Sequence, residues 1–247
     1  MVRRVHIRDK DLVKEVLTSK DFDKPPKLYK NLEFLGPNIL TSKREEWKKH
    51  RRVCNPGFSR NAMVSLCEQT QKFCDLMIEG INKKLKNGED TLGIYDYTTK
   101  LTLSVIISTG FGRDATDLWT ENSSEQKESK KNTNGRLDID HSFQILTRNL
   151  FLLMGFPSWF RKYFPFFGIP IINRGFNDSL SHLEEIVHQA SESFDDKAKD
   201  IISLLVKANR SDSNLLTESE IKSDSFIFML AGRKFFFFQK NSIFIMF

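Results

Sequence analysis

A tryptophan and an arginine four residues apart form the most informative polar pair in this sequence. Trp47 and Arg51 lie within EEWKKHRRVCNPGF, residues 45–58, which has the pattern of a helix that stops at an Asn-Pro-Gly turn. Residues i and i+4 share a helix face, so an indole N–H and a guanidinium group would emerge side by side. Such a pair suits a buried carboxylate. The alternative is an amphipathic helix with Trp47 in the core and Arg51 in solvent, and the spacing alone favours that alternative.

Other motifs that could carry chemistry are absent or incomplete. Residues 110–115, GFGRDA, fit the dinucleotide pattern G-x-G-x-x-A, but a charged loop follows where a helix would have to hold the pyrophosphate. We therefore predict the C-terminus of a helix there. His182 and His188 are six residues apart and would point to different helix faces, so they predict no metal site. No G-x-S-x-G or Walker sequence occurs, and we assign no catalytic or metal-binding residue.

Composition sets wider limits on the protein. Its 247 residues are 39% hydrophobic and 28% charged, which allows a substantial core. The net charge of +6 permits nucleic acid, anionic lipid or an acidic protein as partner and selects none of them. Cys54, Cys67 and Cys74 form no C-x-x-C pair, so we expect reduced thiols and neither a disulfide framework nor a zinc site. The segment MVRRVHIRDKDLVKEVL is too charged for a signal peptide or an anchor.

Apolar periodicity predicts a mainly α-helical chain. Only Val5–Ile7 is a candidate for a short strand. One long helix, ending at Asn87-Gly88, carries Cys67 and Cys74 on a face that we expect in the core. A polar segment at 120–136 has no helical pattern. The other predicted helices start at Asp9, run over 43–54, 101–108, 138–154, 174–194 and 197–208, and start at a capping box at 217–220.

The segment around Trp47 resembles the W-x-x-x-R helix of the cytochrome P-450 haem-thiolate monooxygenases, and Pro56-Gly57-Phe58 matches the P-x-F turn that follows it. Other segments resemble the family in the same order. VHIRDKDLVKEVLTSKDFDKPP is similar to its early strand and helix, TKLTLSVIISTGFG to its central E helix, and LTESEIKSDSFIFMLAG to the approach to its long I helix. The resemblance covers residues 1–232 and is strongest to the eukaryotic microsomal branch. It implies the N-terminal half of that fold, mainly α with a minor β element near the N-terminus.

The resemblance also implies where a haem would bind. In the family, the Trp and Arg of this helix hydrogen-bond a haem propionate, so the resemblance gives Trp47 and Arg51 that role. An Arg–carboxylate pair is charge-assisted and can be bidentate, which fits the assignment. Ala231-Gly232 would lie where the I helix crosses the haem.

Partners and a location follow from the same resemblance. Lys48, Lys49 and Arg52 would form the surface that receives an NADPH-dependent flavoprotein reductase, with a solvated basic face as the alternative. Residues 151–172, rich in aromatic side chains, would contact a membrane surface, with an internal core segment as the alternative. The resemblance implies the cytoplasmic face of the endoplasmic reticulum membrane.

Several family features are missing from the sequence. The loop F-x-x-G-x-R-x-C-x-G, whose thiolate binds the haem iron, does not occur, and neither does the E-x-x-R pair. In the I-helix motif A-G-x-[DE]-T, Lys234 and Phe235 replace the acid and the alcohol that serve proton delivery. The family match stops after Gly232. We interpret residues 233–247, RKFFFFQKNSIFIMF, as a non-family tail, with an interfacial helix as the alternative.

The resemblance and these departures together predict a monooxygenase that oxidises a hydrophobic small molecule with dioxygen and NADPH-derived electrons. We expect the present form to be truncated, to bind haem weakly without a thiolate, and to be inactive alone. Substrate contacts would fall at 24–40, at 151–172 and before Ala231. One alternative is a basic helical protein that binds a membrane surface or nucleic acid through residues 43–52, although interspersed acidic residues argue against nucleic acid. Another is a truncated competitor for the reductase.

Overall fold

The structure, a computed structural model, is mainly α-helical, as predicted. It describes residues 5–24, 29, 32–88, 91, 93–119, 136–150, 152, 169–192, 200–210 and 215–243, with residues 233–243 described by their backbone alone. The α-helices of this part are α1 (Lys10–Thr18), α3 (Arg44–Cys54), α4 (Arg60–Lys86), α5 (Ile94–Phe111), α6 (Ile139–Arg148), α9 (Ile169–Glu192), α10 (Ile201–Arg210) and α11 (Glu218–Ile243). Two short 3₁₀ helices, η2 (Asn55–Phe58) and η3 (Thr116–Trp119), follow α3 and α5.

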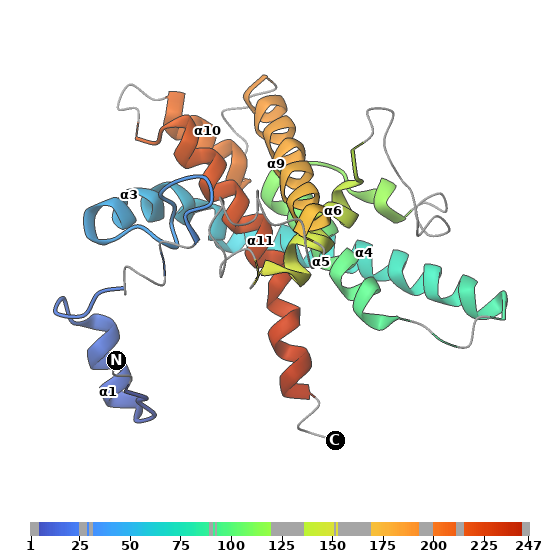
Figure 1. Ribbon diagram of the computed structural model, residues 1–247, viewed down its shortest axis with the longest axis horizontal. Helices are drawn as coiled ribbons and strands as arrows, with labels where there is room; N and C mark the ends of the chain where they lie inside the picture. Colours follow the sequence, from blue (N-terminus) through green and yellow to red (C-terminus); the bar gives the residue numbers. More distant parts are fainter. Residues whose placement is uncertain are drawn as a thin grey trace.

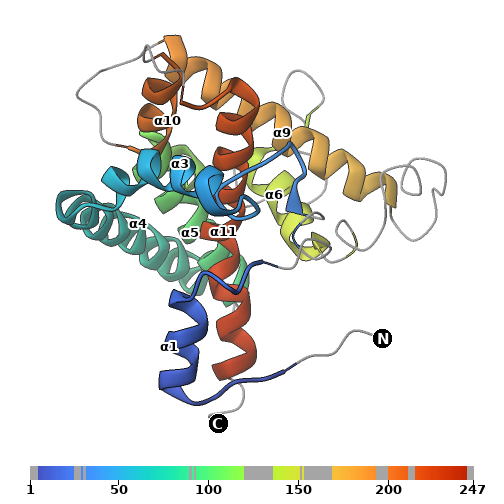
Figure 2. The same ribbon diagram turned by 90° about the vertical axis from the view of Figure 1, so that its left-hand side faces the viewer.

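Helix α11 runs through the centre of the arrangement (Figure 1). Helix α5 packs against α11, and α4 covers α5. The pair α6 and α9 lies on one side of α11, whereas α3 and α10 lie together on the other side (Figure 2). Helix α1 lies apart from this group and buries none of its residues. Asp9 nevertheless caps α1 as predicted, because its side chain accepts the N–H groups of Asp11 and Leu12.

Aromatic side chains from distant segments form the centre of the core. Phe73 of α4, Phe143 of α6 and Phe226 of α11 are buried with at most 1% of their surface exposed. Phe34 and Phe176 contact Phe226 edge-on, with ring centroids 5.7 and 5.9 Å from it. These contacts fix the loop before α3 against α9 and α11.

Two glycines shape a helix end and a helix crossing. Gly112 ends α5 in the left-handed conformation (φ 62°), and the Arg113 N–H donates to the Ile107 carbonyl. The predicted helix end within GFGRDA is thus confirmed. Gly175 allows α9 to approach α6 closely, because a Cβ at this position would lie 2.7 Å from Ile145 Cγ2.

Three predictions about elements need correction. The strand predicted at Val5–Ile7 is not formed, because these exposed residues meet no strand in the described part of the chain. Helix α4 ends at Asn87-Gly88 as predicted, but Cys67 is exposed and Cys74 only half-buried. The buried stripe of α4 is centred on Phe73, and Cys67 lies about 120° around the helix from it. Helix α9 already begins at Ile169, inside the predicted aromatic loop.

Two sequence predictions concern residues that are largely outside the description. The polar segment at 120–136 is described only at residue 136, and the aromatic segment at 151–172 only at Leu152 and from Ile169 onward. The membrane-surface contact of the aromatic segment therefore stays a prediction. Among the helices whose residues are described, none has both the length and the apolarity to cross a bilayer.

Candidate functional site

Helix α3 carries the Trp–Arg pair, and its charges favour the helix. Glu45 and Glu46 lie in the first turn, where the helix dipole stabilises acids, and Arg51 and Arg52 lie in the last turn, where it stabilises bases. Pro56 follows at the start of η2 and cannot donate the N–H that would continue α3. The buried residues of α3 are His50, Val53 and Cys54.

Trp47 and Arg51 are both exposed on α3, one helical turn apart. Trp47 is 39% exposed, so the alternative is wrong in placing Trp47 in the core, although Arg51 is exposed as that alternative has it. Neither side chain forms a hydrogen bond or an ion pair with any residue that the structure describes. Their N–H groups can therefore donate to an acceptor that the described chain does not itself supply.

A histidine–aspartate pair, which the sequence reasoning missed, fixes the inner face of α3. His50 Nδ1 lies 2.6 Å from Asp224 Oδ2 of α11, and both side chains are 0% exposed. The other oxygen of Asp224 accepts the Ile39 N–H at 2.7 Å. His50 Nε2 lies 3.6 Å from Glu220 Oε1 and has no hydrogen-bond partner among the described residues. The only sequence signal for this pair was an acidic residue close to the apolar run of the last helix.

Lys49 forms a second link from α3 to α11. Its Nζ lies 2.5 Å from Glu220 Oε1, while Glu220 Oε2 accepts the Thr217 N–H at 2.8 Å, which confirms the predicted capping box. Burial raises the pKa of Glu220, but hydrogen bonds from Lys49 and Thr217 together lower it by more. The pKa therefore lies below its ordinary 4.5. Lys49 is thus tied to α11, although it had been expected to form one basic surface with Lys48 and Arg52. Lys48 is itself paired with Glu45 on the same helix, at 2.7 Å. Lys48 and Arg52 remain exposed.

The loop at 32–42 is anchored on the first turns of α11 by a buried asparagine. Asn38 is 0% exposed, and its Oδ1 accepts the Leu40 N–H at 3.0 Å. Its Nδ2 donates to Ser223 Oγ of α11 at 3.3 Å. Part of the predicted substrate-contact region, residues 24–40, is thereby held in one position against α11.

The middle of α11 contacts η2 and α5. The rings of Phe58 in η2 and Phe228 in α11 have centroids 6.0 Å apart. Gly232 lies against α5, since Ile106 Cγ1 is 3.1 Å from the position that a Cβ would occupy. Ala231 is exposed. Segments α3 and η2 thus follow α11 toward Ala231-Gly232, and the role of this dipeptide at a haem stays a prediction.

None of the three cysteines has the surroundings of a metal-bound thiolate. Cys54 is fully buried, and this burial, with the nearby Asp224 charge, raises the pKa of the thiol to about 12. The Cys54 thiol is therefore protonated at neutral pH. Cys67 and Cys74 lie on α4, away from the helix that carries the Trp–Arg pair. No group of three His, Cys, Asp or Glu side chains in the described part could hold a metal ion.

The residues present fit one part of a haem group. Exposed indole and guanidinium donors on α3 suit the carboxylates of haem propionates. An axial thiolate is not supplied, because Cys54 is buried and protonated and the other two cysteines lie on α4. The arrangement can therefore bind and orient an acidic group, and it does not by itself complete an iron–thiolate centre.

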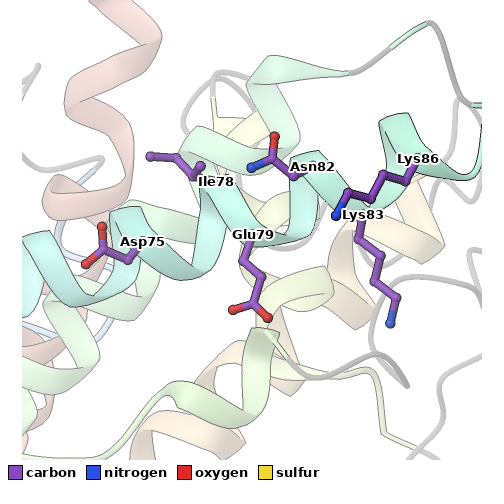
Figure 3. A pocket seen from close by; sticks show the side chains of 6 residues that line it. All are labelled: Asp75, Ile78, Glu79, Asn82, Lys83 and Lys86. Carbon is purple, nitrogen blue, oxygen red and sulfur yellow. The ribbon is translucent and has the colours of Figure 1, made fainter.

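A surface hollow on α4 is a separate feature (Figure 3). Every side chain that lines it comes from this one helix, so the hollow lacks the opposing wall that a small-molecule site needs. The lining residues are Asp75, Ile78, Glu79, Asn82, Lys83 and Lys86. We assign no function to it.

Comparison with known proteins matches residues 1–234 to the family described as cytochrome P-450. Cytochrome P-450 monooxygenase 124 of Postia placenta is 26% identical over 234 residues, which cover 92% of this chain and 43% of the relative. The 11-oxo-beta-amyrin 30-oxidase of Medicago truncatula is 24% identical, with 94% and 43% covered. Cytochrome P-450 3A11 of Mus musculus is also 24% identical, with 92% and 44% covered. The chain spans less than half the length of these relatives.

Proposed function

Because this chain belongs to the cytochrome P-450 family, we propose that it is the N-terminal part of a monooxygenase that oxidises a hydrophobic small molecule with dioxygen and NADPH-derived electrons. The observation that carries the proposal is the pair of exposed donors, Trp47 and Arg51, on a helix that is tied to α11. The fungal relative is named a monooxygenase and the plant relative an oxidase, which supports an oxidative function of this class.

The proposed work of the donor pair is to hold a haem by its propionates. The Arg51 guanidinium can form two parallel hydrogen bonds to one carboxylate, and the Trp47 indole can add a third. When bound, haem supplies the iron at which dioxygen is activated. The residues of this chain bind and orient that group, and its cysteines leave the iron without a thiolate.

This chain alone is therefore proposed to be inactive as a monooxygenase. A thiolate ligand donates the electron density that favours O–O cleavage, and no cysteine of the chain can take that place. The proton-delivery positions of the I-helix motif are Lys234 and Phe235, which supply neither a carboxyl nor a hydroxyl group. Any turnover would depend on groups that this chain does not contain.

The partners and the location are also proposals. Lys48 and Arg52, exposed on the outward face of α3, are proposed to meet an acidic flavoprotein reductase, and charges of this kind mainly raise the encounter rate. The segment at 151–172 is proposed to contact a membrane, in keeping with a place at the endoplasmic reticulum. The competing function of nucleic-acid binding through residues 43–52 is weakened, because Lys49 is paired with Glu220.

A comparison of haem with its dimethyl ester tests the proposed donors, since the ester lacks the propionate charges. The chain should bind haem more tightly than the ester, and Arg51→Ala should remove most of that preference, roughly tenfold or more, because it removes the charged partner of the propionate. Arg44→Ala is the matched control, because it removes the same charge from the first residue of α3. Equal affinity of the unmodified chain for haem and ester would refute the propionate role.

A further inference from the structure

His50 and Asp224 form a contact between α3 and α11 that core packing alone does not require. Both side chains are 0% exposed, and Asp224 also accepts the Ile39 N–H. Burial of a carboxylate has a large desolvation cost, and an apolar pair of similar volume often stabilises a core as well. What a hydrogen bond adds is direction, because it constrains an angle as well as a distance.

A second polar link lies beside the first. Lys49 precedes His50 and bonds to Glu220, which is one helical turn from Asp224 on α11. Successive residues on a helix point about 100° apart, so Lys49 and His50 hold α11 from two directions around the α3 axis. Two directional contacts of this kind oppose rolling of α3 on α11, which a single apolar contact would allow.

The exposed donors lie on the flank of α3 opposite Lys49. Relative to His50, Trp47 is rotated by about 60° and Arg51 by about 100° in one sense, whereas Lys49 is rotated by about 100° in the other. The side chains of a helix reach about 5–6 Å from its axis, so a roll of about 20° would move their ends by about 2 Å. A shift of that size breaks a hydrogen bond.

Building on the proposed function, we propose that His50 and Asp224 are positioning residues, assisted by Lys49 and Glu220. Their buried bond sets the rotation of α3 on α11 and so aims the N–H groups of Trp47 and Arg51 at a propionate. Neither His50 nor Asp224 touches the ligand, because both are fully buried within the protein.

The first test measures the preference for haem over its dimethyl ester in full-length variants. His50→Leu removes the N–H that bonds to Asp224. The preference for haem over the ester should then fall about tenfold, as expected when one charge-assisted hydrogen bond to the propionate is lost. His50→Asn places an amide N–H near the Nδ1 position and should restore most of it. Glu45→Gln is the matched control, since Glu45 is exposed on the outward face of α3, and it should leave the preference unchanged.

A double-mutant cycle separates positioning from general loss of structure. If His50 acts through Trp47 and Arg51, then His50→Leu should have no further effect on the preference in a chain that already carries Trp47→Phe and Arg51→Ala. Additive losses would show that His50 acts by another route and would overturn the proposal. Unfolding curves of each variant establish that the chain is folded under the conditions of the titration.

A ligand-free readout keeps the inference separate from the proposed function. The chain is labelled with 5-fluorotryptophan, and the ¹⁹F resonance of Trp47 is assigned with Trp47→Phe. The chemical shift of this resonance should change in His50→Leu, return to the value of the parent chain in His50→Asn and remain unchanged in Glu45→Gln. If His50→Leu does not fold, Lys49→Met tests the same rotation of α3 on α11. It removes only the partly exposed bond between Lys49 and Glu220. An unmoved Trp47 resonance in the folded variants would overturn the positioning role. Equal binding of haem and ester by the parent chain would reject only the propionate role.

Discussion

Lys49 Nζ and Glu220 Oε1 lie 2.5 Å apart although the two residues are 171 positions apart in the chain. The same carboxylate closes the capping box of α11 with Thr217. One acidic side chain therefore stabilises the start of a helix and holds a second helix against it.

Glu220→Gln should destabilise the folded chain near neutral pH by about 1 kcal/mol, because it weakens both the cap and the bond to Lys49. The pKa of Glu220 is depressed in the folded chain. The stability that the Glu220 carboxylate contributes is therefore present above the ordinary pKa of 4.5. It is lost as the pH falls through the lower pKa of the folded chain. Urea unfolding should show that the free energies of unfolding of the parent chain and Glu220→Gln differ near pH 7, and that this difference shrinks near pH 3. Glu46→Gln, an exposed acid of α3, is the control, and an equal effect there would contradict the double role.

Gly175→Ala should destabilise the chain by about 1–3 kcal/mol, because the new Cβ would lie 2.7 Å from Ile145 Cγ2 at the crossing of α6 and α9. Gly80→Ala in α4 is the matched control, since its nearest neighbour, Tyr97 Cε1, is at 3.9 Å. That substitution should stabilise the chain by up to about 1 kcal/mol through helix propensity. Thermal unfolding measures the stability changes of both variants. Stabilisation by Gly175→Ala would show that the crossing is looser than described.

Local signals explain what the sequence predicted correctly. The caps at Asp9 and at 217–220, the stop after α3 and the end of α5 at Gly112 each depend on residues within a few positions of one another. The pattern of the Trp–Arg pair was equally local, and the structure does place Trp47 and Arg51 together on one exposed helix.

Contacts between distant segments explain what the sequence could not predict. His50 and Asp224 are 174 positions apart, and neither residue type announces its partner. Cys67 was expected in the core because it lies on the apolar face that periodicity identifies, but it is exposed. Periodicity does not reveal how wide a stripe of that face a neighbouring helix will cover. The strand at Val5–Ile7 needed a partner strand, which local sequence does not reveal.

Cysteine reactivity should follow burial and thiolate fraction. With a pKa of about 12, Cys54 would hold roughly 10⁻⁵ of its thiol as thiolate at neutral pH, whereas Cys67 is exposed. Brief treatment with a maleimide, followed by peptide mass spectrometry, should find Cys67 modified and Cys54 untouched. All three cysteines should react alike in denaturant, which serves as the control. Modification of Cys54 at the rate of Cys67 in the native chain would contradict its buried, protonated state.

The haem spectrum should lack the signature of a thiolate. After haem is added, reduced and exposed to carbon monoxide, the chain should show no long-wavelength Soret band, because Cys54 is protonated and Cys67 and Cys74 lie on α4, away from the Trp–Arg pair. Cys54→Ser, Cys67→Ser and Cys74→Ser should leave the spectrum unchanged. A thiolate-type band that disappears in one of these variants would identify an axial ligand and overturn the expectation.

Removal of residues 233–247 should raise the soluble yield of the chain and lower its light scattering. The backbone of α11 continues as a helix to Ile243, and a helix places Phe235–Phe238 on all sides of its axis, so no single packing face can cover the four rings. A run of four phenylalanines favours association, because a segment of high hydrophobicity and β-propensity tends to pair as strands. The control is the full chain with Phe236→Ser and Phe238→Ser, which keeps the length and removes half of the run. This variant should behave like the shortened chain. If the shortened chain is no more soluble than the full chain, or needs the tail to stay in solution, then the tail is a packed part of the fold, and its interpretation as a non-family extension is wrong.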